Sequence, residues 1–216
     1  MSNMADECAA DAGDDLAYSY KPSLMGAAFE FRLRPEALEW RKGRHEGRTP
    51  YGRIARVRLS FRPMTMQMRR FVTEIWPADG PKLTIASTTW RSLVEQSAQD
   101  DAYGAFIREL HRRMVDQSLA DQSLADLGLA AAPSQASFET GMSPVLYWPG
   151  LALFAGASVG FVVLTVRALE LAAYGGAALI GGFLVLSLWQ SGVYFRRNRP
   201  GRYRPEAPPR YLVPGG

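Results

Sequence analysis

Alternating hydrophobic and polar residues predict β-strands in the first half of the chain. In AFEFRLR, residues 28–34, Phe29, Phe31 and Leu33 alternate with charged residues, and this period of two is typical of a strand with one buried face. RIARVRLSFR, residues 53–62, repeats the pattern. ALEWRK with the turn-rich segment after it indicates one hairpin, and RFVTEIW and KLTIASTT around PADGP indicate another. We therefore expect about five antiparallel strands.

Helical spacing replaces this alternation after residue 100. The apolar positions that recur every three or four residues are Tyr103, Phe106, Ile107, Leu110 and Met114, so an amphipathic helix is expected. Asp100 and Asp101 are expected to cap its N-terminus. The tandem repeat DQSLADQSLAD, residues 116–126, either continues the helix or is a duplication in a linker, because its period fits no solenoid. The fold class is α+β, an antiparallel β-rich soluble domain closed by one helix.

Two long apolar runs follow, at residues 145–166 and 171–195. The first contains no ionisable group, and the second contains only the phenols of Tyr174 and Tyr194. Each run is long enough to cross a hydrocarbon core of ~30 Å as a helix, whereas core helices of soluble proteins are amphipathic. The runs are separated by residues 167–170, so we expect a two-helix transmembrane hairpin over residues 145–195.

Charges around the apolar runs predict the topology. The residues after Phe195 include six arginines, Arg196, Arg197, Arg199, Arg202, Arg204 and Arg210, against one acid, Glu206. Basic residues that flank a span stay on the cytoplasmic side, and the first fifteen residues lack the features of a secretory signal. We expect a multi-pass membrane protein with both termini cytoplasmic.

The expected organisation has five parts. Residues 1–20 form a disordered acidic tail, 21–126 the soluble domain, 127–144 a linker, 145–195 the hairpin and 196–216 a basic, proline-rich tail. Because of its prolines and glycines, this last segment is expected not to form a packed element, and to lie along the membrane surface or against the cytoplasmic domain.

The formal net charge of +4 hides a strongly basic region between residues 21 and 72. Arg53, Arg56, Arg58 and Arg62 belong to one predicted strand, and with Arg196 and Arg197 they are candidates for contact with anionic lipid or a protein partner. The competing interpretation is that the strand arginines pair across strands with acids that include Glu30, Glu36 and Glu39. A basic patch also attracts nucleic acid, but we expect no nucleic-acid partner.

The segment GASVG, residues 156–160, fits the G-x-S-x-G pattern of hydrolases, which makes Ser158 a candidate nucleophile. That pattern works on a strained turn beside a histidine base, whereas Ser158 lies in an apolar span, His45 in a predicted loop and His111 on the expected polar face of the helix. The single cysteine, Cys8, excludes an intrachain disulfide. No catalytic residue, cofactor, metal or small-molecule substrate is expected, so the chain is interpreted as non-enzymatic.

Small residues in the two runs predict close helix packing instead. Gly156 and Gly160 form a small-xxx-small pattern, and Gly181 and Gly182 belong to matching patterns in the second run. Because the connection between the runs is short, we expect the close contact to lie between the two spans of one chain.

A resemblance to known proteins is carried by the expected hairpin and by three further segments. These segments are RVRLSFRPMTMQMRRFVTEIW and FIRELHRRM before the hairpin and RNRPGRYRPEAPPRYLVP after it. The chain resembles a group of small, uncharacterised bacterial inner-membrane proteins whose cytoplasmic part is similar to a pleckstrin-homology-like (PH-like) domain. This implies a binding or scaffold module for a protein or an anionic lipid. An oligomeric channel or a transporter accessory subunit, assembled by self-association, is the alternative.

Overall fold

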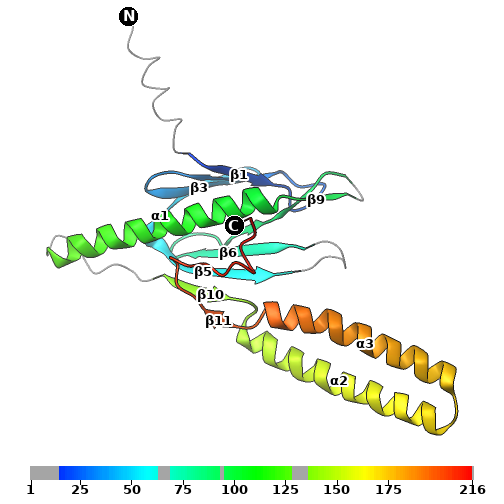
Figure 1. Ribbon diagram of the computed structural model, residues 1–216. Coiled ribbons are helices and arrows are strands. Elements are labelled where there is room, and N and C mark those ends of the chain that lie inside the picture. Colours follow the sequence, from blue (N-terminus) through cyan, green and yellow to red (C-terminus); the bar gives the residue numbers. More distant parts are fainter. Residues whose placement is uncertain (1–14, 63–68, 93–94, 128–135, 216) are drawn as a thin grey trace, which may run out of the picture. The chain divides into compact units, whose positions relative to one another are not determined.

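The computed structural model describes residues 15–62, 69–92, 95–127 and 136–215 (Figure 1). The chain divides into two compact units, Met1–Glu139 with Arg202–Gly216, and Thr140–Gly201. In chain order the second unit is therefore inserted into the first. We call the first the β-rich unit and the second the hairpin unit.

A four-stranded antiparallel meander begins the β-rich unit. Its strands are β1 (Ala17–Tyr20), β2 (Phe29–Leu33), β3 (Ala37–Lys42) and β4 (His45–Pro50), in that order across the sheet. The alternation seen in the sequence sets its register, which places Phe31 opposite both Tyr18 and Trp40. A two-residue turn joins β3 to β4, and its first residue, Gly43, has a φ of +64°, which favours glycine.

The second sheet has the order β11-β10-β5-β6-β7. A 3-10 turn, Tyr51–Arg53, leads into β5 (Ile54–Phe61), which pairs antiparallel with β6 (Phe71–Pro77), and β6 pairs antiparallel with β7 (Leu83–Ala86). The outer strands β10 (Ser137–Thr140) and β11 (Gly201–Arg202) come from either side of the inserted unit. A small hairpin, β8 (Thr88–Trp90) with β9 (Gln96–Ala98), completes the strands.

Side chains of the first sheet cap the free edge of β7. The Tyr18 hydroxyl donates to the Ala86 carbonyl at 2.6 Å, the Tyr20 hydroxyl to the Thr84 carbonyl at 2.6 Å, and Lys42 Nζ to the Lys82 carbonyl at 2.9 Å. Burial raises the pKa of Tyr18 and raises that of Tyr20 to about 12, so both hydroxyls remain donors. Three alternate carbonyls of an edge strand are thereby satisfied without a further strand.

Helix α1 (Asp100–Asp126) packs its predicted apolar face into the core of the β-rich unit (Figure 1). Tyr103, Phe106, Ile107 and Leu110 are fully buried, and the Tyr103 hydroxyl bonds Thr73 Oγ1 at 2.6 Å. The five-residue repeat continues the helix to Asp126. The capping prediction is wrong, because the N-cap is Gln99 and Asp100 and Asp101 lie inside the first turn, where acids still favour the helix dipole.

The last segment of the chain packs on α1, so its place against the soluble domain was among the expected ones, whereas the expectation that it forms no packed element is wrong. We call residues 203–215 the C-terminal strap. Leu212 is fully buried and Val213 is 4% exposed. A Cβ at Gly104 of α1 would lie 1.7 Å from the Pro214 carbonyl oxygen, so the strap approaches the helix backbone where only glycine leaves room. The proline-rich composition of the segment gave no sign that Leu212 and Val213 would complete the core.

Other boundaries also differ from those expected. Strand β1 occupies part of the segment expected to be a disordered tail, because Tyr18 and Tyr20 are buried and the acidic residues lie before them. Strand β10 lies in the expected linker. The β-rich unit therefore extends beyond residues 21–126 at both ends, while residues 1–14 and 128–135 lie outside the described residues.

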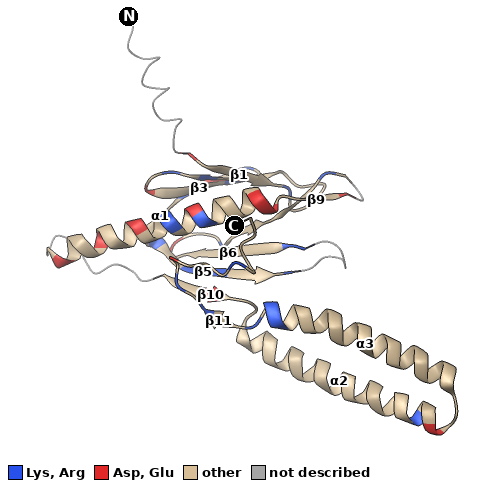
Figure 2. Cartoon of the chain, viewed as in Figure 1, with Lys and Arg blue, Asp and Glu red and all other residues tan. Residues whose placement is uncertain are grey.

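The hairpin unit consists of α2 (Pro144–Glu170) and α3 (Tyr174–Arg197). Both are long and apolar enough to cross a membrane, and their most apolar windows are 0% and 6% buried. Helix α2 continues through the expected turn to Glu170, whose carboxylate pairs with Arg167 at 2.9 Å. The connection is instead at residues 171–173, where Ala172 has a φ of 56°. Figure 2 shows that charged residues of this unit occur only near the ends of the helices.

Candidate functional site

The four candidate arginines lie in β5 or directly beside it, a group that we call the β5 row, and all have partners within the β-rich unit. Arg53 pairs with Asp79 at 2.9 Å, Arg62 with Glu74 at 3.0 Å and Arg58 with Glu139 at 2.5 Å. The Arg56 guanidinium lies 4.3 Å from the centre of the Trp76 ring. Pairing with an acid is therefore present at three of the four positions, but the acids named from the sequence, Glu30, Glu36 and Glu39, pair with other arginines. Lipid contact by this row stays a prediction.

Trp76 is the centre of a cluster that the sequence analysis missed. Its ring has Arg56, Arg58 and Lys82 within 4.3, 5.2 and 4.7 Å of its centre, a geometry in which cations are attracted to the aromatic face. The register places Arg56 directly opposite Trp76. The signal was available, since Trp76 alternates with buried Ile75 and Thr73 and so falls on the polar face of its strand.

Two carboxylates offset much of this cluster's charge. Glu74 is 5% exposed and accepts from Arg62 and from Lys82, the latter at 2.6 Å. The Arg58 side chain is only 14% exposed where it meets Glu139. Four cations, Arg56, Arg58, Arg62 and Lys82, against Glu74 and Glu139 leave a net charge of +2. Among the described residues Arg56 has no carboxylate partner, and its guanidinium lies against the Trp76 ring instead.

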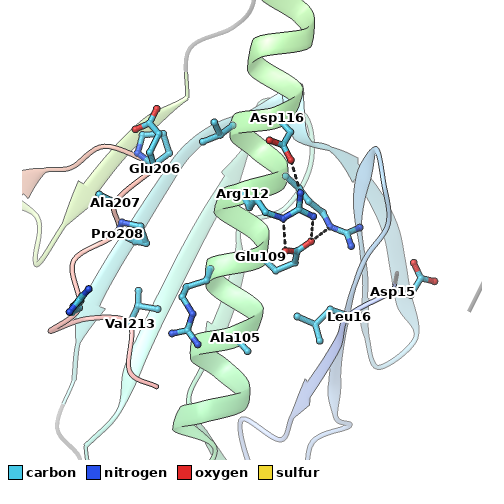
Figure 3. A pocket seen from close by; sticks show the side chains of 15 residues that line it. Asp15, Leu16, Ala105, Glu109, Arg112, Asp116, Glu206, Ala207, Pro208 and Val213 are labelled. Carbon is cyan, nitrogen blue, oxygen red and sulfur yellow. Dashed lines mark hydrogen bonds and ion pairs between the residues drawn. The ribbon is translucent and has the colours of Figure 1, made fainter. Parts of the chain in front are cut away.

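An open groove of about 1180 Å³ runs along α1 between the start of β1 and the C-terminal strap (Figure 3). Its charged lining residues are Arg108, Arg112, Arg113, Arg210, Asp15, Glu109, Asp116 and Glu206, four of each sign. Hydrogen bonds from Arg112, aided by Arg113, lower the pKa of Glu109, and Arg112 also pairs with Asp116 at 2.7 Å. Arg108 donates to the Pro214 and Gly215 carbonyls of the strap. The groove is thus charge-balanced, and Arg108 links α1 to the strap.

His111 is buried, so its expected place on the polar face of the helix is wrong. It is 1% exposed, with Nδ1 2.7 Å from the Ile107 carbonyl oxygen and Nε2 2.7 Å from the Tyr203 hydroxyl. A carbonyl only accepts, so Nδ1 carries the proton and Nε2 accepts from Tyr203. Burial lowers the pKa of His111 to about 4, and the ring is neutral at pH 7. It fixes the strap rather than offering an accessible base.

Ser158 has no catalytic neighbour in the hairpin unit. Its hydroxyl donates to the Phe154 carbonyl of its own helix at 2.8 Å, and both histidines belong to the β-rich unit. Within the described residues, no group of three or more His, Cys, Asp or Glu side chains is placed to hold a metal ion.

The predicted glycine contact between the spans is corrected by the structure. A Cβ at Gly156, Gly160 or Gly182 would have no atom within 4 Å, whereas one at Gly181 would lie 3.6 Å from Thr165 Cγ2. Larger residues form the seam, with Phe154 against Phe195 and Phe161 against Phe183. Residues 154, 158, 161 and 165 share one helix face, and Gly156 lies about 200° from Phe154 around the axis.

Arg196 and Arg197 lie at the end of α3, in a segment that we call the hairpin foot, residues 140–148 and 194–201. The two chain segments of the foot are held together there by close backbone contacts and hydrogen bonds. Gly141 has a φ of +75° and its Cβ would lie 2.3 Å from the Asn198 carbonyl oxygen, while the Met142 amide donates to that oxygen at 2.9 Å. Asn198, 2% exposed, also bonds the Tyr194 carbonyl. Arg196 and Arg199 remain exposed.

Comparisons with known proteins found no matching family model, curated protein or solved structure.

Proposed function

We propose that this chain is a non-enzymatic binding or scaffold module of the bacterial inner membrane, with a cytoplasmic PH-like domain anchored by a two-span hairpin. Its ligand is a protein or an anionic lipid. The PH-like identity rests on the sequence resemblance and on the antiparallel sheets closed by α1. An observed fold does not determine an activity. The proposal therefore depends on the division of the chain into a β-rich unit and an apolar hairpin unit.

The separation of the two units carries the proposal. Every member of the hydrophobic core lies in the β-rich unit, from Tyr18 to Val213. The apolar helices contribute nothing to that core, and residues such as Leu153 and Leu179 are 77% and 74% exposed. Apolar surface of this extent needs a hydrocarbon environment or another protein to cover it. A complete domain combined with an uncovered apolar hairpin is typical of a membrane anchor.

Charge asymmetry along the hairpin supports a cytoplasmic location for the β-rich unit. Arg196, Arg197 and Arg199 lie at the foot, and the opposite end has Arg167 paired with Glu170. The foot therefore has more positive charge than the opposite end of the hairpin, and the more positive end of a membrane hairpin is retained in the cytoplasm. Both connections to the β-rich unit leave from the foot, so both chain ends are on that side.

The first test is extraction and topology. The full chain should stay in the membrane fraction at alkaline pH, and a reporter that is active only in the periplasm should be inactive when it is fused after Gly216. Release by alkali would contradict the anchor, and strong reporter activity would contradict the orientation.

A shortened chain tests whether the β-rich unit folds without the hairpin unit. The Tyr203 amide donates to the Phe138 carbonyl at 3.2 Å, so a short turn can join Glu139 to Arg202 in place of residues 140–201. This variant should be soluble and unfold cooperatively, because the whole core remains. An insoluble or molten product would contradict the claim that the hairpin serves only as an anchor.

A further inference from the structure

We infer that the hairpin foot is a binding site for the phosphate group of an anionic phospholipid, formed by Arg196 and Arg199. The inference rests on the proposed membrane function and names the ligand class and the residues. It assigns lipid contact to the foot instead of the arginine row of β5.

The first argument is the availability of charge. Neither Arg196 nor Arg199 has an ion pair among the described residues, and both are exposed. The only acid between residues 140 and 201 is Glu170, which lies at the other end of α2 and pairs with Arg167. By contrast, Arg53, Arg58 and Arg62 of the β5 row each already bind a carboxylate. An added phosphate therefore meets uncompensated charge at the foot.

The second argument is depth in the bilayer. From Tyr147 to Arg167 the helix rises ~30 Å, the thickness of a hydrocarbon core. If the Arg167 end of α2 lies at the headgroups of one leaflet, the foot therefore lies at the headgroups of the other leaflet. Aromatic rings gather there as expected of a membrane interface, with Tyr147 against Trp148 and Phe195 at 5.4 and 5.7 Å between ring centres. Trp148 is 60% exposed, so its ring is available to lipid.

The third argument is preorganisation. The Thr140 hydroxyl donates to the Arg199 carbonyl at 3.5 Å, and a Cβ at Gly141 would lie 2.5 Å from that oxygen. The Asn198 amide bonds the Tyr194 carbonyl at 3.0 Å. The backbone that bears both arginines is thus fixed before a ligand arrives, which reduces the entropy lost on binding. Arginine is also the side chain best suited to bind phosphate oxygens in pairs.

The experiment measures binding of a short-chain phosphatidylglycerol to the full-length protein in an uncharged detergent, with the phosphatidylcholine of equal chain length as the zwitterionic reference. The test variant is Arg196→Gln with Arg199→Gln. The matched control is Arg53→Gln with Arg56→Gln, which removes the same charge from the β5 row.

We expect the wild type and the control to prefer phosphatidylglycerol, and we expect the foot variant to lose about 30-fold in affinity, since each basic side chain near an anionic surface contributes about 5-fold. The preference should weaken with added salt. Equal binding of both lipids by the wild type, or a greater loss in the control than in the foot variant, would overturn the inference.

Alkaline extraction of the wild type separates this result from the proposed function. A chain that stays in the membrane but shows no phosphatidylglycerol preference rejects the foot site alone. A chain released by alkali rejects both.

Discussion

Substitution of Gly104 by alanine tests the attachment of the C-terminal strap. By helix propensity alone, Gly104→Ala stabilises a helix interior by about 1 kcal/mol. In this fold, however, the new Cβ would lie 1.7 Å from the Pro214 carbonyl oxygen and 2.9 Å from its carbon. Backbone atoms cannot remain at that distance, so the strap has to move.

The size of the effect follows from what the strap contributes. Burial of Leu212 and Val213 provides roughly 1.5–3 kcal/mol for each side chain, and ordering the strap opposes part of this gain. The two hydrogen bonds from Arg108 to the strap carbonyls add about 1 kcal/mol each. Displacement of Pro214 disrupts these bonds and loosens Leu212. We expect a net destabilisation of about 2–3 kcal/mol despite the gain in propensity.

Hydrogen exchange of the strap amides measures this effect. The Leu212 and Val213 amides both bond the Pro209 carbonyl, and their exchange should accelerate by about 30- to 150-fold. Gly192→Ala is the control, because a Cβ at Gly192 has no neighbour within 4 Å and should leave strap exchange unchanged. Unchanged strap exchange in Gly104→Ala, together with higher stability, would refute the docked strap.

Three further predictions concern other contacts. Tyr18→Phe and Tyr20→Phe should each cost about 1–2 kcal/mol in urea unfolding, because each leaves a β7 carbonyl without its donor; a loss below about 0.5 kcal/mol would contradict edge capping. The lowered pKa of His111, about 4 against 6.5 when unfolded, means that the unfolded state binds the extra proton first. Stability should therefore fall by about 3 kcal/mol as the pH drops from 6.5 to 4, and His111→Gln should flatten this part of the profile. Gly181→Leu should lower the melting temperature in mild detergent while Gly182→Leu does not, since only Gly181 faces the other span; equal effects would contradict the observed seam.

Periodicity predicted the elements well where one face is buried. The alternation in AFEFRLR and RIARVRLSFR corresponds to β2 and β5, and the five apolar positions chosen for α1 are all buried. These predictions succeed because burial on one face requires a fixed period. The first strand and the strap were missed for a related reason. Each has only two buried side chains, Tyr18 with Tyr20 and Leu212 with Val213, and two residues do not establish a period.

Site predictions depended on partners that are distant in sequence. Arg58 meets Glu139 across a separation of 81 residues, and His111 meets Tyr203 across 92. No local pattern encodes such pairs, so the sequence did not decide between lipid contact and pairing for the arginines, and a histidine followed by two arginines was expected on the polar face. The glycine prediction failed because a small-xxx-small pattern shows that close approach is possible without showing which helix approaches.

The inserted hairpin and the strap together explain how the two connections are kept adjacent. In the hairpin unit, the Met142 amide bonds the Asn198 carbonyl, and in the β-rich unit the Tyr203 amide bonds the Phe138 carbonyl. Each unit therefore holds the same two chain segments together independently, which lowers the loop-closure entropy that the other must overcome. Because the strap follows the hairpin in the chain, Leu212 reaches the core only after both spans have been made. The β-rich unit thus completes its core when its anchor is complete, and loosening the clamp at Gly141 should weaken the strap through the chain connection alone.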